Sequence, residues 1–283
     1  MLQILRANNP TPLTGPGTNT FLIGQHEVAV IDPGPDDPAH LEAILAAAGP
    51  GRITAILVTH AHLDHSAAAP ALSAATGAPV LGFGPPNAGR SPVMMRLEAS
   101  GFAGGGEGVD TGFLPDRQLR DGDVIESAEW RLTALWTPGH FGGHLAYQWG
   151  DALFVGDIVL GWSSTLISPP DGDLSDYMRS LERIAAAKPA RLYPAHGDPV
   201  DDPPARLAEL AAHRRARTAE ILGALTGGPA SAEELARRIY DVPPLLLPAA
   251  ARNVFAHLIA LETLGVLRCD GPPSATARFS QIS

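Results

Sequence analysis

The chain has 283 residues, of which 45% are hydrophobic and 18% charged, and its formal net charge is −10 at pH 7. This composition is ordinary for a globular protein with a substantial core, and its acidity argues against a protein that follows a nucleic-acid backbone over a wide face. The single cysteine, Cys269, cannot form an intrachain disulfide, which favours a reducing compartment and excludes a cysteine-based zinc site.

The start of the chain shows no targeting signal. Residues 1–10 lack the basic and apolar regions of a secretion signal, and no apolar run in the sequence is long enough to span a bilayer. We therefore expect a cytoplasmic protein that does not partner with a membrane.

Two short strands and a helix are predicted next. Residues 21–24 and 28–32 predict a hairpin, and 38–48 predict a helix. Asp32 ends the second strand, and two roles for its carboxylate remain open. It forms the turn at Pro33 and Gly34, or it orients a metal-binding histidine from behind.

The most unusual segment is 59–65, with the sequence Thr-His-Ala-His-Leu-Asp-His. The apolar run 53–59 predicts a strand buried on both faces, and the Ala- and Leu-rich run 63–76 predicts a helix. The histidines therefore lie in a loop between a strand and a helix.

The spacing of these side chains suits two metal ions side by side. His60 and His62 alternate at the extended end of the strand and can point the same way, while Asp64 and His65 can reach a second point nearby. The alternative is that the histidines lie on the surface and Asp64 only caps the helix. That alternative would not explain three histidines within six positions.

Between residues 82 and 122 the regular pattern fades, and 101–112 are especially rich in glycine. A long loop inside a compact domain is usually functional or mobile. Residues 101–112 could form a lid over the metal site or an inert insertion, and composition does not distinguish the two.

Further metal-binding side chains follow the later predicted strands. These strands are expected at 124–125, 130–136, 145–149, 152–155 and 191–193. His140, Asp157 and His196 each come directly after one of them, and open sheets gather their ligands at such strand ends. With the first motif the count is five histidines and two aspartates, enough for two sites that share one carboxylate. The other histidines follow no such pattern, although His144 could hydrogen-bond at the edge of the site.

These motifs occur along the chain as His60-x-His62-x-Asp64-His65, Gly139-His140, Gly156-Asp157 and His196-Gly197, preceded by Val30-Ile31-Asp32-Pro33-Gly34. In this order they resemble the signature of the metallo-beta-lactamase fold hydrolases, over a region from about the N-terminus to residue 200. The resemblance implies an α/β fold, the αββα sandwich, with a dinuclear metal site. It also implies one role for each ligand. One metal would be held by His60, His62 and His140, the other by Asp64, His65 and His196, and Asp157 would bridge them.

A narrower resemblance is carried by residues 15–24, by residues 156–165 and by the tail. These segments are similar to the lactamase-beta-like protein 2 branch of that family. Its animal member is similar to single-strand-specific endoribonucleases, and its bacterial members are mostly uncharacterised hydrolases. A reaction transfers less safely than a fold.

The tail changes in composition after Asp202, which predicts a catalytic domain at 1–202 and a second domain at 203–283. Helices are expected at 205–225, 231–239 and 248–265, and a hairpin at 266–269 and 277–279. Three helices and a hairpin indicate a winged-helix module.

The charge of the tail differs from that of the rest. After Asp202, nine arginines oppose seven acidic residues, a net of +2, and since the whole chain carries −10, the preceding part carries −12. The only concentrated basic run is 213–217. It is either a solvated helix face or a phosphate contact near a nuclease site.

The predicted site supports hydrolysis without a serine or cysteine nucleophile. Two cations roughly 3.5 to 4 Å apart lower the pKa of a bridging water towards about 7 and polarise the scissile carbonyl or phosphoryl oxygen. Imidazole and carboxylate ligands suit two Zn²⁺, and Mn²⁺ or iron would also fit. Asp64 or a metal-bound water is the candidate proton donor to the leaving group. Just beyond Asp157, the hydroxyls of Ser163, Ser164 and Thr165 are candidates to contact substrate, or they only form a turn.

Three functions remain open from the sequence. The first is a phosphodiesterase that cleaves single-stranded RNA, favoured by the branch resemblance, the winged helix and the basic run. The second is a hydrolase of a small thioester, lactone or amide, favoured by the acidic surface and by a tail without interleaved aromatics. The third is a regulatory nucleic-acid-binding protein with an inert hydrolase domain, which the full set of ligands disfavours. The oligomeric state stays open.

Overall fold

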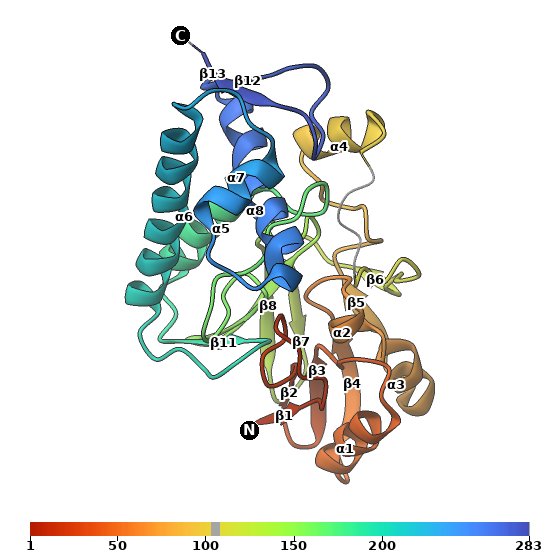
Figure 1. The fold of residues 1–283 in the computed structure, drawn as a ribbon. Coiled ribbons are helices and arrows are strands. Elements are labelled where there is room, and N and C mark those ends of the chain that lie inside the picture. The colour runs from red at the N-terminus through yellow and green to blue at the C-terminus, as the bar shows by residue number, and fades with distance from the viewer. Residues whose placement is uncertain (103–107, 283) are drawn as a thin grey trace.

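A computed structural model describes residues 1–102 and 108–282, and its strands form three sheets (Figure 1). The six-stranded sheet contains β1 (Leu2–Arg6), β2 (Asn19–Ile23), β3 (Glu27–Ile31), β4 (Arg52–Leu57), β5 (Val80–Gly82) and β6 (Arg117–Gln118), in that order. The five-stranded sheet has the order β11 (Arg191–Pro194), β10 (Ala152–Gly156), β9 (Leu145–Trp149), β8 (Arg131–Trp136) and β7 (Val124–Glu126). The third is the hairpin of β12 (Leu267–Cys269) and β13 (Phe279–Gln281).

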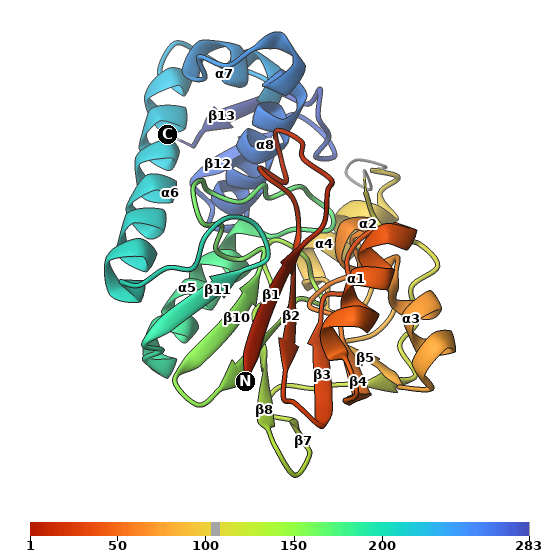
Figure 2. The same cartoon turned by 90° about the horizontal axis from the view of Figure 1, so that it is seen from below.

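The two large sheets face each other across a core of apolar side chains. Phe21 on β2 packs against Phe154 on β10, with ring centroids 4.9 Å apart. Helices α1 (Pro38–Ala48) and α3 (Ala69–Thr76) lie beside the first sheet, and α5 (Leu174–Ala187) lies beside the second (Figure 2). Each sheet is thus buried on both faces, and the predicted αββα sandwich is confirmed.

The direction of the strands brings the functional loops to one edge. Strands β3, β4, β5 and β6 are parallel, and β10 and β11 are parallel. Since β9 is antiparallel to both β8 and β10, β8 runs the same way as β10. The predicted metal-binding motifs lie in the loops after β4, β8, β10 and β11. The loops after β8, β10 and β11 therefore leave the second sheet at one edge, and the loop after β4 leaves the first sheet at the C-terminal ends of its parallel strands.

The predicted helix at 63–76 is wrong in one respect, because it is two helices. The first, α2 (Leu63–Ser66), ends before α3 begins, and Pro70 occupies the first turn of α3. A proline ring clashes with the carbonyl four residues earlier and offers no N–H, so it favours a new helix start over a continuous helix.

The absence of regular structure predicted between residues 82 and 122 is also wrong. Helix α4 (Pro92–Ala99) forms there, with Ser91 accepting a hydrogen bond from the Met94 N–H and proline at its first turn, and β6 follows. Met94 and Leu97 of α4 pack with apolar side chains of the C-terminal helices and not in the core between the sheets.

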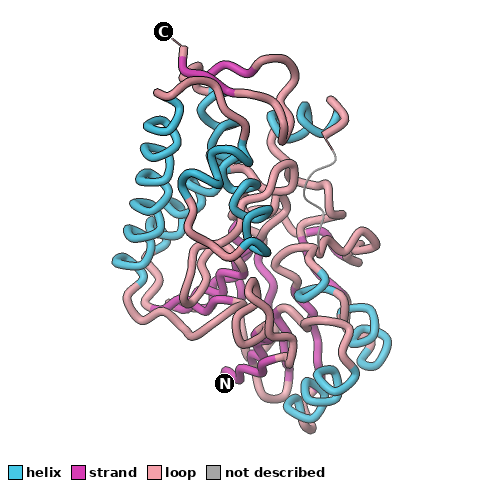
Figure 3. The backbone as a smooth tube through the Cα atoms, in the orientation of Figure 1, coloured by secondary structure: helices cyan, strands magenta, loops and turns pink. Residues whose placement is uncertain are grey.

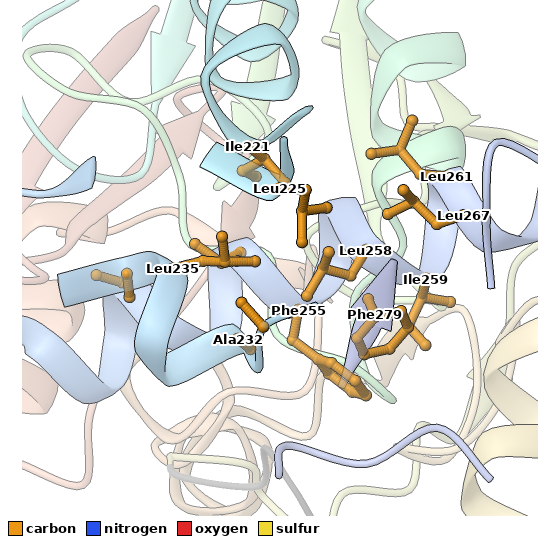
Figure 4. Close-up of a cluster of buried hydrophobic side chains, with 14 of the residues drawn as sticks. Ile221, Leu225, Ala232, Leu235, Phe255, Leu258, Ile259, Leu261, Leu267 and Phe279 are labelled. Atoms are coloured by element: carbon orange, nitrogen blue, oxygen red, sulfur yellow. The ribbon is translucent and has the colours of Figure 1, made fainter. Parts of the chain in front are cut away.

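The C-terminal part is the predicted winged-helix fold. It consists of α6 (Pro203–Leu225), α7 (Ala232–Ile239), the 3₁₀ turn Pro244–Leu246, α8 (Leu247–Thr263) and the β12–β13 hairpin. A reciprocal capping box between Ser231 and Glu234 starts α7. Phe255 and Leu258 of α8 meet Phe279 of β13 in a separate core (Figure 4). Most helix lies at this end of the molecule and most strand at the other (Figure 3).

Helix α6 contributes to both cores. Leu207 and Leu210 in its first half pack with the cluster around α5, whereas Ile221 and Leu225 in its second half belong to the C-terminal core. The domain boundary at residue 202 stays a prediction. The chain continues across it as one helix capped by Asp202.

One helical segment, Pro244–Thr263, has the length and apolar composition needed to cross a bilayer, contrary to the expectation from sequence. In this fold its buried side chains pack into the C-terminal core and against the cluster around α5. The segment is accounted for as the central helix of the winged-helix module.

Candidate metal centre

The structure brings all seven predicted ligands together. Candidate ligand atoms lie within 4.8 Å of one another in three overlapping groups: His60, His62 and His140; Asp64, His65 and His196; and His60, His65 and Asp157. The first two groups are the two sets that the sequence predicted, and we call them triad 1 and triad 2.

In triad 1 three ring nitrogens converge. The Nδ1 atom of His62 lies 2.8 Å from His60 Nε2 and 3.1 Å from His140 Nε2. His140 Nδ1 donates to the backbone carbonyl of Leu166 at 2.7 Å, and His60 Nδ1 lies 3.0 Å from the hydroxyl of Thr59. These outer contacts place the ring protons away from the centre, so that both Nε2 lone pairs point inward.

In triad 2 a carboxylate joins two rings. Asp64 Oδ2 lies 3.2 Å from His196 Nε2 and 3.5 Å from His65 Nε2, and it accepts a hydrogen bond from the Thr18 hydroxyl at 3.1 Å. His65 Nδ1 donates to the buried carboxylate of Asp32 at 3.0 Å. This contact is the one expected of a carboxylate that orients a metal-binding histidine, and that role of Asp32 stays a prediction.

Asp157 lies between the triads. One oxygen is 3.4 Å from His196 Nε2 and 3.6 Å from His65 Nε2, and the other is 3.7 Å from His140 Nε2. Its backbone N–H donates to Nε2 of buried His144 at 3.2 Å. His144, which the sequence left at the edge of the site, therefore holds Asp157 in place.

The donor set fits divalent cations. His65 Nε2 and Asp157 Oδ1 are buried, and neither atom has a hydrogen-bond partner. Unpaired buried polar atoms are unfavourable, and a cation between them would satisfy both. Imidazole nitrogens with carboxylate oxygens suit zinc, manganese or iron.

Comparison with known proteins supports this assignment. Residues 13–196 match the Metallo-beta-lactamase superfamily, and residues 231–271 match the Beta-lactamase associated winged helix domain. The chain belongs to the metallo-beta-lactamase superfamily. Members are hydrolases that bind divalent metal, so this chain is a hydrolase of that superfamily.

Similar proteins match nearly the whole length of the chain. The Beta-lactamase-like protein 2 homolog of Drosophila melanogaster is 30% identical over 278 residues, covering 92% of this chain and 87% of the relative, which confirms the predicted branch. A metallo-beta-lactamase family protein from Thermus thermophilus superposes with a TM-score of 0.80 at 29% identity, over 99% of this chain and 98% of that one. The atrochrysone carboxyl ACP thioesterase of Aspergillus chevalieri is 27% identical, over 92% of this chain and 79% of its own length.

The two triads of this superfamily site differ in charge. Burial lowers the pKa of His62 to about 3, and burial together with neighbouring imidazoles holds the pKa of His60 well below its ordinary value. In triad 2 burial acts in the same direction, but the negative charge of Asp157 and the close carboxylates of Asp157 and Asp64 raise the pKa of His196 to about 9. Asp64, Asp157 and Asp32 likewise raise the pKa of His65 well above its ordinary value.

This difference predicts the protons released when metal binds. At pH 7.5, which is below the raised pKa values of His65 and His196, both rings are protonated imidazolium ions, and a metal ion must displace one proton from each. The triad 1 rings, with their lowered pKa values, are neutral and have no such proton to lose. We expect about two protons released by triad 2, fewer as the pH rises past 9, and about none by triad 1. Zn²⁺ calorimetry in buffers of different ionisation enthalpy measures this number. Release of no protons at pH 7.5 would contradict the assignment.

A cavity of about 390 Å³ opens over the metal centre. The predicted substrate contacts Ser163 and Ser164 line it, beside the half-exposed Trp162. Thr165 lines it too, but its side chain is buried and its hydroxyl lies 3.0 Å from His140 Nδ1. The role of these three residues in substrate binding stays a prediction.

Much of the cavity wall was not predicted. One part is the N-terminal turn 11–14, and another comes from the winged-helix module: Tyr240, Val242, Leu246, Ala249, Ala250 and Asn253. No lysine or arginine is among the described residues that line the cavity. These residues lie far from the histidine motifs in sequence, so only the folded chain reveals them.

Part of the predicted lid, 103–107, lies outside the described residues. Two residues that follow this part are described. Gly108 lines the cavity, and Val109 forms an isolated antiparallel bridge with His62. The end of this segment thus contacts the metal centre directly.

The arginines of the basic run 213–217 differ in their exposure to solvent. Arg214 is buried, and Arg217 stacks over the Tyr240 ring at 3.9 Å and pairs with Glu220. Only Arg215 of the three arginines is exposed. Two charges of the run are therefore used inside the fold, and phosphate contact by the run stays a prediction.

Proposed function

We propose that this hydrolase cleaves a small acyl compound, a thioester or lactone, with two Zn²⁺ held by triads 1 and 2 and by Asp157. The observation that carries the proposal is the cavity wall. Outside the candidate metal ligands it is built largely from apolar side chains on three segments, and no lysine or arginine is among its described residues. An acyl chain suits such a wall, whereas the phosphates on either side of a scissile phosphodiester would find no lysine or arginine there.

Each residue of the centre has a task in this reaction. The cations, when bound, supply a water of lowered pKa and a Lewis acid for the scissile carbonyl. Asp64 accepts a hydrogen bond from the Thr18 hydroxyl and lines the cavity, and we assign to it the transfer of a proton to the leaving group. We assign to the hydroxyls of Ser163 and Ser164, which line the cavity beside Trp162, the orientation of the substrate.

A relative supports the acyl substrate. The thioesterase from Aspergillus chevalieri matches 92% of this chain and 79% of its own length. By its name it hydrolyses an acyl carrier thioester, and the same bond class is what we propose here.

Cleavage of single-stranded RNA is the second candidate, favoured by the relationship to Beta-lactamase-like protein 2 and by the winged-helix module. Its weakness is electrostatic. Affinity for nucleic acid comes mainly from basic side chains that face phosphates, and two arginines of the strongest basic run face inward.

Parallel assays decide between these functions. Zn²⁺-loaded protein is incubated with an acyl-glutathione thioester, an acyl-homoserine lactone and labelled single-stranded RNA. We expect turnover of the thioester or lactone and intact RNA. A different result would reverse the order of the candidates. In that result the wild type cleaves RNA but no acyl substrate, and a variant without triad 1 no longer cleaves RNA. No turnover of any substrate would favour an inert regulatory domain.

The length of the acyl group provides a further prediction. Ala249 lines the cavity from α8, and Ala249→Phe would fill part of this space. We expect KM for a long acyl thioester to rise roughly tenfold while KM for an acetyl thioester stays the same, because only the longer chain needs that wall. Equal changes for both substrates, measured by steady-state kinetics, would place the acyl chain elsewhere.

A further inference from the structure

Arg214 is a buried cation with no ion pair among the described residues. The residue is 2% exposed, and its guanidinium carbon lies 5.0 Å from the centre of the Tyr177 ring. A buried charge is unfavourable unless hydrogen bonds compensate for the loss of water. Its acceptors are Oδ1 of Asn253, at 3.3 Å, and the backbone carbonyl of Thr165. The buried charge is therefore committed to α8 and to the backbone of a loop at the metal centre.

That loop, 165–167, is held at both ends. Arg214 donates to the carbonyl of Thr165 at its start, and the backbone N–H of Ile167 at its end donates to Asn253 Oδ1 at 3.0 Å. Because Asn253 Oδ1 also accepts from Arg214, the two side chains and the loop form one connected set of hydrogen bonds. Such sets become more rigid as more of their polar atoms are paired, and in this one Arg214 Nε is buried without a hydrogen-bond partner.

Between the two fixed points lie the groups that hold a predicted metal ligand. The carbonyl of Leu166 accepts from His140 Nδ1 at 2.7 Å, and the Thr165 hydroxyl lies 3.0 Å from the same atom. These contacts set the direction in which His140 Nε2 points. Groups that orient a ligand in this way typically change metal affinity about 10- to 100-fold when they are removed.

We infer that Arg214 and Asn253 form a clamp that positions His140 for metal binding. The clamp joins α6 and the winged-helix module to triad 1, so the module completes the metal centre as well as the cavity. The inference rests on the metal site of the proposed function, but not on any particular substrate.

The test measures Zn²⁺ affinity by competition with a chromophoric chelator, on protein shown by circular dichroism to be folded. Arg214→Met and Asn253→Ala are each expected to weaken binding about 10- to 100-fold, and Arg214→Lys to weaken it less. Arg217→Met is the matched control, because Arg217 lies one turn further along α6 and contacts no residue of the 165–167 loop. Its Zn²⁺ affinity should equal that of the wild type. If Arg214→Met does not fold, Asn253→Ala and Arg214→Lys carry the same test.

A second measurement separates positioning from general destabilisation. In a His140→Ala background, Arg214→Met should have no further effect on Zn²⁺ affinity, since its route to the metal is gone. The proposal that Arg214 and Asn253 position His140 would be overturned by either of two results. One is that Arg214→Met reduces Zn²⁺ affinity by the same factor in both backgrounds, and the other is that the folded Arg214 and Asn253 variants bind Zn²⁺ with wild-type affinity. Failure of the wild type to bind Zn²⁺ would instead contradict the proposed function.

Discussion

Replacing Asp157 by alanine is expected to weaken metal binding at both triads and to lower the rate of hydrolysis roughly 100- to 1,000-fold. The reason is its position, because its oxygens lie within 3.7 Å of histidines from both triads. Burial opposes its ionisation, yet the charges of His196 and His65 hold the pKa of this carboxyl well below its usual range. It is therefore an anion at neutral pH, and its loss removes negative charge from both sites.

The matched comparison is His65→Ala, which removes a ligand from triad 2 only. Metal content measured by atomic emission after equilibrium dialysis should fall at both sites for Asp157→Ala and mainly at one for His65→Ala. Wild-type protein that is saturated with a single ion would refute the two-metal site. Equal patterns in the two variants would show that Asp157 serves triad 2 alone.

Changing Asp64 to asparagine is expected to reduce turnover roughly 100-fold or more while triad 1 keeps its metal. Asparagine preserves the shape and one oxygen, but it removes the charge beside His65 and His196 and cannot carry a proton. The charges of these rings keep the pKa of Asp64 below its ordinary value, despite the opposing effect of burial. Triad 1 lacks Asp64 and should bind metal as before.

The two roles of Asp64 can be separated by the leaving group. With a substrate whose leaving group needs no protonation, such as an activated thiophenyl ester, recovery of most of the rate in Asp64→Asn would identify a proton carrier. A variant that stays inactive on this substrate and has lost its second metal would identify a ligand only, and the proton would then come from water.

The position of the metal centre could be predicted because the information is local in sequence. The five histidines and two aspartates sit in short motifs directly after strands, and parallel strands bring such motifs to one edge. The cavity wall gave no comparable signal. Leu13, Tyr240 and Ala249 are ordinary apolar residues whose meaning depends on how α8 and the N-terminal turn fold back over the site.

The same distinction explains what the sequence missed in the fold. Helix α5 was overlooked although Leu174, Tyr177, Leu181 and Ile184 follow a helical period and are buried, so its signal was present. Arg214 is different, because an arginine among other arginines is normally solvated. Its burial depends on acceptors 39 and 49 residues away in the chain, which no local pattern reveals.

Helix α6 makes the unfolding of the two domains one event. It runs without a break from the cluster around α5, where Leu207 and Leu210 pack, to the C-terminal core, where Ile221 and Leu225 pack. Neither core can open without losing side chains of this helix, so heat or denaturant should produce a single cooperative transition in place of two. A chain that ended at residue 202 would lose the shared helix and leave apolar surface beside α5 exposed to water, and would be prone to aggregate.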